Sequence, residues 1–66
     1  MNWDQIKGNW KQVQGKVKEQ WGAFTDDDIA RMEGQRDQLV GKIQEKYGCG
    51  REEAERQVKS WEGRIH

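Results

Sequence analysis

Residues 3–22 carry one apolar stripe with helical spacing, and they read WDQIKGNWKQVQGKVKEQWG. The apolar side chains recur every three or four residues, at Trp3, Ile6, Trp10, Val13, Val17 and Trp21. This spacing places them on one face of an α-helix. Gly22 is then expected to end that helix as its C-cap.

A second helical segment is expected to begin at Thr25. Its side chain can cap the first turn, with Asp28 three residues later in a capping-box arrangement. The acidic residues 26–28 also suit the positive end of a helix dipole. The stripe that follows comprises Ile29, Met32, Leu39, Val40, Ile43 and Tyr47. A break near Gly34 would divide this segment into two helices.

The last segment follows a glycine-rich turn at residues 48–50 and is expected to form a helix from Arg51. Its stripe consists of Ala54, Val58, Trp61 and Ile65. Proline is absent and β-branched residues are few, so nothing predicts a strand. The chain is therefore predicted to be all-α, a small bundle of three to five helices.

An internal repeat appears when the sequence is shifted by 26 residues. Residues 8–22 (GNWKQVQGKVKEQWG) then align with residues 34–48 (GQRDQLVGKIQEKYG), and 6 of the 15 pairs are identical. Two such units that pair their apolar stripes would form a small helical bundle. We expect residues 1–66 to form one domain.

Composition limits both the core and the partners. Of the 66 residues, 32% are hydrophobic and 36% charged, so one small domain must fold around a thin core. Twelve basic residues balance 12 acidic ones, whereas nucleic-acid binders usually carry a basic excess. No apolar run is long enough for a membrane span or a secretory signal, so a cytoplasmic location is expected.

Seven-residue spacing relates Gly8, Gly15 and Gly22, and likewise Gly34, Gly41 and Gly48. Gly22 and Gly48 fit C-caps, but each interior glycine lowers helix stability by about 0.5–1 kcal/mol relative to alanine. Two interpretations of the other four remain open. Either another helix approaches closely there, or these glycines keep the fold only marginally stable. The small core favours the second interpretation.

Candidate catalytic groups are scarce. The sole histidine, His66, stands at the chain end, and Cys49 lies between two glycines with no histidine near it in sequence. Cys49 cannot form an internal disulfide; a tolerated small residue is favoured over a redox sensor or an intermolecular disulfide. Capping explains residues 26–28 better than calcium binding, which needs alternating ligands. We expect no enzyme activity, and no catalytic, cofactor-binding or metal-binding residues.

Four tryptophans are many for 66 residues. Burial in the core is the favoured interpretation, because aromatic side chains supply much apolar area. The alternative is a partner surface on the first helix, where tryptophans and lysines would contact a protein or a nucleic acid. Its candidate residues are Trp3, Lys7, Trp10, Lys11 and Lys18.

The motifs GNWKQVQGKVKEQWG at 8–22 and FTDDDIARMEGQRDQLVGKIQEKYG at 24–48 strongly resemble the CsbD-like family of small bacterial general-stress proteins. The resemblance covers nearly the whole chain. It implies a small helical domain, with two hairpins packed crosswise as in SAM-like folds, and no known activity or ligand residues. Several members are similar to hydrophilins, and the glycine content and mean hydropathy of −1.31 fit that description independently.

Three hypotheses about function follow. The first is a non-enzymatic stress protein that protects macromolecules through hydration and weak contacts with client proteins. The second is a small helical binding module that uses the tryptophan and lysine residues of the first helix. The third is self-assembly through the thin apolar stripes, although a monomer is the expected state.

Overall fold

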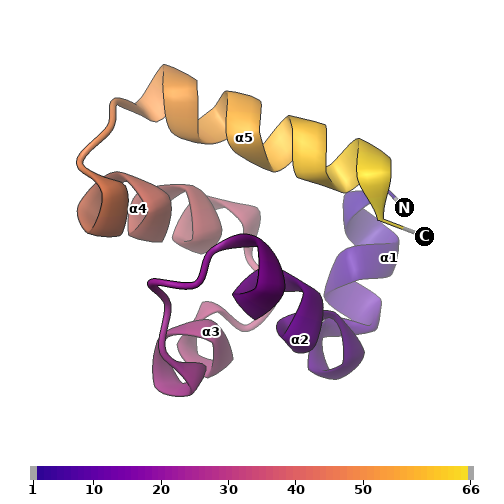
Figure 1. Cartoon of the computed structure of the whole chain (residues 1–66). Helices are drawn as coiled ribbons and strands as arrows, with labels where there is room; N and C mark the ends of the chain where they lie inside the picture. Colours follow the sequence, from indigo (N-terminus) through magenta and orange to yellow (C-terminus); the bar gives the residue numbers. More distant parts are fainter. Residues whose placement is uncertain (1, 66) are drawn as a thin grey trace.

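The computed structural model describes residues 2–65, which form five α-helices. They are α1 (Trp3–Gly8), α2 (Trp10–Gln20), α3 (Asp26–Met32), α4 (Arg36–Tyr47) and α5 (Arg51–Arg64). Helix α2 packs on α3, α3 on α4, and α4 on α5, the last two as an antiparallel hairpin (Figure 1). Helix α1 lies beside the carboxyl end of α5 (Figure 1). The predicted all-α bundle of three to five helices is confirmed.

Helix boundaries follow the predicted caps in most places. The Thr25 hydroxyl accepts a hydrogen bond from the Asp28 N–H at 3.0 Å, and an Asp28 carboxylate oxygen accepts one from the Thr25 N–H at 3.0 Å. This reciprocal pair is the capping box predicted for α3. Helix α4 ends at Gly48, whose φ of 65° is left-handed. The predicted break near Gly34 and the last helix from Arg51 are also confirmed.

The expected single helix over residues 3–21 is wrong at one point. The helix is interrupted at Asn9, whose φ of −113° and ψ of 29° separate α1 from α2. The Asn9 side-chain amide donates to the Gln5 carbonyl at 3.0 Å and closes the end of α1. The break turns α1 so that its Trp3 side chain reaches the turn between α3 and α4. Gly22 also differs from expectation, because its φ is not left-handed.

One apolar core joins all five helices. The predicted stripes supply 14 of its 15 buried side chains, with Phe24 in the loop after α2 as the addition. The members are Ile6, Trp10, Val13, Val17, Trp21, Phe24, Ile29, Met32, Leu39, Val40, Ile43, Ala54, Val58, Trp61 and Ile65. Tyr47 is 45% exposed, and Trp3 is partly buried against the core.

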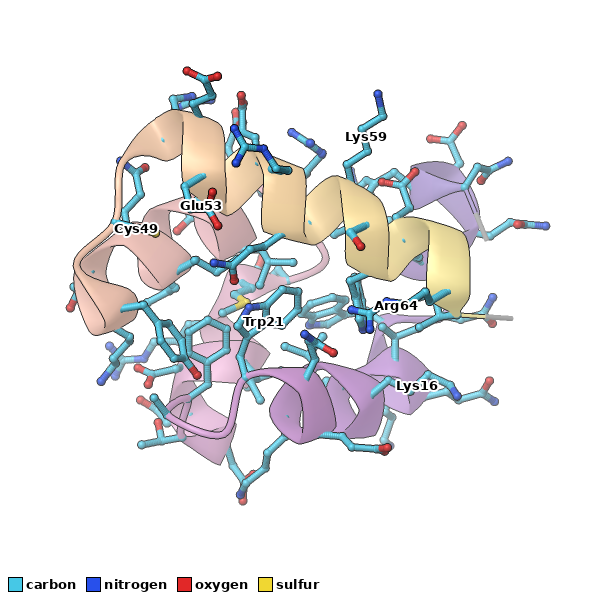
Figure 2. All side chains as sticks on the ribbon, turned by 45° about the horizontal axis from the view of Figure 1, so that its top comes forward. Lys16, Trp21, Cys49, Glu53, Lys59 and Arg64 are labelled. Atoms are coloured by element: carbon cyan, nitrogen blue, oxygen red, sulfur yellow. The ribbon has the colours of Figure 1, made fainter. Side chains whose placement is uncertain are left out.

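A row of aromatic rings runs through this core and joins helices distant in sequence. Trp3 meets Trp61 edge-on at 6.4 Å between ring centroids, and Trp61 lies 5.3 Å from Trp21. Trp21 stacks on Phe24 at 6.0 Å, and Phe24 meets the Tyr47 ring at 6.2 Å. Figure 2 shows Trp21 between α5 and α2. These five residues, the aromatic row, connect α1, α5, the end of α2 and α4.

The close approach of another helix explains only one of the four glycines that were not assigned as C-caps. At Gly34, φ is +76°, and a Cβ would lie 3.1 Å from Cγ and 3.2 Å from Cα of Lys7 in α1. A Cβ at Gly8, Gly15 or Gly41 would meet nothing within 4 Å. The close-approach interpretation is therefore correct for Gly34 and wrong for the other three.

The predicted repeat of residues 8–22 in residues 34–48 stays a proposal. Helices α2 and α4 begin at Trp10 and Arg36, 26 residues apart, which is compatible with it. The two glycines that open the units differ in conformation, since Gly8 ends a helix and Gly34 lies in a left-handed turn.

Replacing the open glycines should stabilise the fold. Gly15→Ala and Gly41→Ala should each raise the free energy of unfolding by about 0.5–1 kcal/mol, because alanine favours the helix and its methyl group meets no neighbour. Urea denaturation followed by circular dichroism measures this change. Gly34→Ala is the matched control and should destabilise, since its backbone is left-handed and its Cβ would crowd Lys7. A Gly15→Ala protein no more stable than the parent would contradict the account.

Candidate functional site

The five residues of the predicted partner surface do not lie on one exposed face. Trp10 is 9% exposed, and its indole N–H donates to the Ile29 carbonyl at 3.2 Å. It therefore lies in the core, which was the favoured interpretation of the tryptophans, and offers no exposed indole to a partner. Truncating Trp10 would remove core packing, so Trp10→Ala would test stability rather than binding.

The three lysines have different surroundings. The Lys18 ammonium lies 2.7 Å from a carboxylate oxygen of Asp26, so it bridges α2 to the start of α3. Lys11 is exposed, with no ion-pair partner in the part of the chain that the structure describes. Lys7 is exposed too, but its alkyl stem lies against Gly34. Only Lys7 of the three lies beside a tryptophan that is partly accessible.

Trp3 and Lys7 line an open groove between α1 and the start of α4. The Trp3 indole N–H donates to the Gly34 carbonyl at 2.9 Å, which fixes the ring at the edge of the groove. The groove has a volume of about 350 Å³, and its lining residues are Trp3, Asp4, Lys7, Gly34, Gln35, Arg36 and Asp37. Sequence reasoning missed the members from α4, because only the fold brings them to α1.

The charges in this groove are of both signs. Lys7 and Arg36 line it together with Asp4 and Asp37, and the Arg36 guanidinium lies 3.8 Å from a carboxylate oxygen of Glu55. Mixed charges beside one indole fit weak polar contacts rather than strong binding of a polyanion.

Two further grooves lie between α2 and α5. One, of about 150 Å³, is lined by Lys16, Glu19, Gln20, Trp61, Arg64 and Ile65. The other, of about 290 Å³, is lined by Gln20, Glu53, Arg56, Gln57, Ser60 and Arg64. Figure 2 labels Lys16 of α2 and Arg64 at the end of α5, which both line the first of these grooves. Over residues 2–65, Ser60 is the one hydroxyl group in these two linings, and neither lining includes a cysteine.

The metal-ligating side chains of residues 2–65 do not form a cluster. No group of three or more His, Cys, Asp or Glu side chains is placed to hold a metal there. Cys49 is partly buried, and its Sγ lies 3.9 Å from the Ile43 carbonyl oxygen. None of the five helices is long and apolar enough to cross a bilayer.

The carboxylate of Asp28 has a distinctive electrostatic environment. The pKa of Asp28 is lowered from 3.8 to about 2, and the largest cause is the hydrogen bond from the Thr25 backbone N–H. The Thr25 hydroxyl and the ammonium groups of Lys46 and Lys42 act in the same direction, whereas burial opposes the shift. The two ammonium groups lie 3.4 Å and 3.6 Å from its oxygens. Asp28 therefore caps α3 and ties it to α4, which is a structural role.

Acid should weaken the fold through this group. Because the pKa of Asp28 is lower in the folded state, its carboxylate adds stability above about pH 4, and this contribution is lost as the pH falls toward 2. Asp28→Asn should be less stable than the parent at pH 7 and should lose less stability between pH 4 and pH 2. Urea unfolding at several pH values measures both effects.

The control for this pH dependence is Asp27→Asn. It removes a carboxylate from the same turn, one that pairs with Arg31 at 3.0 Å but takes no part in the capping box. Identical pH profiles for Asp28→Asn and the parent would contradict the capping role.

Comparison with known proteins identifies the family. The sequence model of the CsbD-like family matches residues 4–56. The UPF0337 protein YjbJ of Escherichia coli O6:H1 is 64% identical over 64 residues, which cover 97% of this chain and 93% of that protein. A UPF0337 protein of Pseudomonas aeruginosa is 51% identical over 65 residues, which cover 98% of this chain and all of that protein. The chain therefore belongs to the CsbD-like family of small bacterial general-stress proteins.

Proposed function

We propose that the protein is a non-enzymatic, hydrophilin-like protectant, which accumulates in the bacterial cytoplasm under stress and shields other macromolecules through hydration and weak, reversible contacts. The observation that carries the proposal is that, in the described chain, the apolar side chains gather in one core and the exposed side chains are mostly polar or charged. Its 15 buried hydrophobic residues form one cluster, and no polar or charged residue is buried. The surface of the described residues consists mainly of charged and polar groups.

The charge pattern of this surface suits contacts that are weak and unselective. Its basic and acidic residues are equal in number, so no strong net field attracts a polyanion or a polycation. Many charges pair with neighbours on the same helix, as Arg31 does with Asp27 and Arg56 with Glu52. Such exposed pairs contribute at most about 1 kcal/mol each. They can therefore open and form other contacts at little cost.

Exposed apolar area is small. Tyr47 is the one large hydrophobic residue in residues 2–65 that is exposed, and its hydroxyl accepts a hydrogen bond from the Ala23 N–H at 3.2 Å. A chaperone that holds unfolded chains would offer a large apolar patch. The described surface offers none, which favours protection by hydration over capture of unfolded clients.

Freezing or drying a labile client enzyme tests the proposal. The protein should preserve more client activity than an equal mass of lysozyme or albumin. A variant with Lys11→Gln, Glu19→Gln, Glu33→Gln and Lys59→Gln keeps the net charge but removes four exposed charged groups, and it should protect less well. Protection no better than that of lysozyme would overturn the proposal.

A stabilised variant separates the folded surface from marginal folding as the source of protection. Gly15→Ala with Gly41→Ala leaves every charge in place and strengthens the fold. It should protect as well as the parent if the hydrated surface acts. Weaker protection by this variant would show that loose folding is required, contrary to the proposal.

The second candidate is a binding module, and the groove beside Trp3 and Lys7 is the observation that favours it. We propose this groove as the surface that would contact a protein or a nucleic acid. Titration with RNA, DNA and cell lysate, followed by amide shifts, should then saturate at micromolar concentrations. Lys7→Gln should weaken the binding, and Lys59→Gln, which removes an exposed lysine from α5, should not. A flat titration would exclude this function.

A further inference from the structure

The break at Asn9 interrupts a stripe that the sequence itself continues. The apolar positions of α1, Trp3 and Ile6, keep helical spacing with Trp10 and Val13 of α2. The same side chains would therefore share one face if residues 3–20 formed a single straight helix. The sequence is compatible with two conformations, a bent one and a straight one.

Helical hydrogen bonds reach the break from both sides. The Asn9 N–H donates to the Gln5 carbonyl at 3.0 Å, and the Val13 N–H donates to the Asn9 carbonyl at 3.0 Å. The Gln12 N–H donates to the same Asn9 carbonyl at 2.9 Å, as in a tight first turn. Residue 9 alone thus departs from helical dihedrals, and straightening the chain requires a change at this one residue.

Helix α1 contacts several residues that are distant in sequence. The Trp3 indole bonds to the Gly34 carbonyl, 31 residues away, and the ring contacts Trp61 of α5. Ile6 is fully buried in the same core, and Lys7 lies against Gly34. We call the surface formed by Gly34 and Trp61 the α1 socket. A six-residue helix is too short to persist alone in water, so α1 needs a socket.

We propose that the α1 socket is an exchange interface between two copies of this chain. In the exchanged dimer, residues 3–20 of each copy form one straight helix, and each α1 occupies the socket of its partner. Every docking contact of the monomer is kept, because the socket receives an identical α1. Each copy also gains the helical hydrogen bonds that the break at Asn9 prevents.

Concentration decides between the two forms. In the monomer, α1 is tethered to its own socket by a short link, which corresponds to an effective concentration on the order of millimolar. The monomer therefore prevails in dilute solution, and the exchanged dimer forms at millimolar protein. Withdrawal of water concentrates the protein toward that range.

Substitutions at Asn9 test the exchange. Asn9→Ala and Asn9→Gly both remove the bond of the Asn9 side chain to the Gln5 carbonyl, and they differ mainly in helix propensity. The alanine variant should dimerise at least tenfold more tightly than the glycine variant, since residue 9 becomes helical in both copies of each dimer. Gln12→Ala is the control and should behave as the parent, because residue 12 is helical in both forms. Light scattering after size-exclusion chromatography, with loading up to millimolar protein, measures the dimer.

A second measurement separates exchange from ordinary association. In a dimer of ¹⁵N-labelled and ¹³C-labelled copies, a nuclear Overhauser effect should join the Trp3 indole proton of one copy to the Gly34 α protons of the other. A monomer for Asn9→Ala at the highest concentration would overturn the proposal. A dimer without this contact between copies would overturn it too, as would equal dimerisation of the alanine and glycine variants. No client enters these measurements, so their failure leaves the protectant proposal untouched.

Discussion

The contact between Trp21 and Trp61 is the interaction on which the rest of the structure depends. With ring centroids 5.3 Å apart, the two indoles fill the space between the end of α2 and the carboxyl half of α5. The Trp21 indole N–H also donates to the Gln57 side-chain oxygen at 3.0 Å, which satisfies the polar atom of the ring at the edge of the core. A 66-residue chain has few apolar side chains to bury, so large rings let a small number of residues hold five helices together.

Much of this fold is predictable because it depends on local chemistry. Helical spacing identifies the buried stripes, and the capping box at Thr25 marks the start of α3 because its partners lie within four residues. What could not be predicted depends on contacts between distant residues. The break at Asn9 is hidden by a continuous apolar pattern, and the role of Gly34 appears only when α1 docks beside it. Phe24 escaped notice because a lone loop residue has no periodicity. The candidate surface was predicted on a single straight helix. Because that helix is bent, its residues are distributed over α1 and α2.

The core of the molecule indicates specific packing, whereas the exposed helix positions indicate modest stability. The aromatic row and the satisfied buried polar atoms describe a specifically packed domain, with no unpartnered buried side-chain nitrogen or oxygen over the described residues. The glycines at 15 and 41 lower its stability, although a Cβ at either position would meet nothing within 4 Å. A stress protein that acts by hydration requires solubility and abundance more than high stability. We therefore expect a uniquely folded protein of modest stability, in which the charged exterior would carry the proposed function.

A ¹H–¹⁵N correlation spectrum of the protein in dilute neutral buffer tests this central claim most directly. The account predicts well-dispersed amide signals and four separate indole N–H signals, since Trp3, Trp10, Trp21 and Trp61 have different ring neighbours and hydrogen-bond partners. Dispersion should be present without any crowding or water-withdrawing cosolute. A narrow amide spectrum with overlapping indole signals, which disperses only when water is withdrawn, would contradict the account and indicate a chain that folds conditionally.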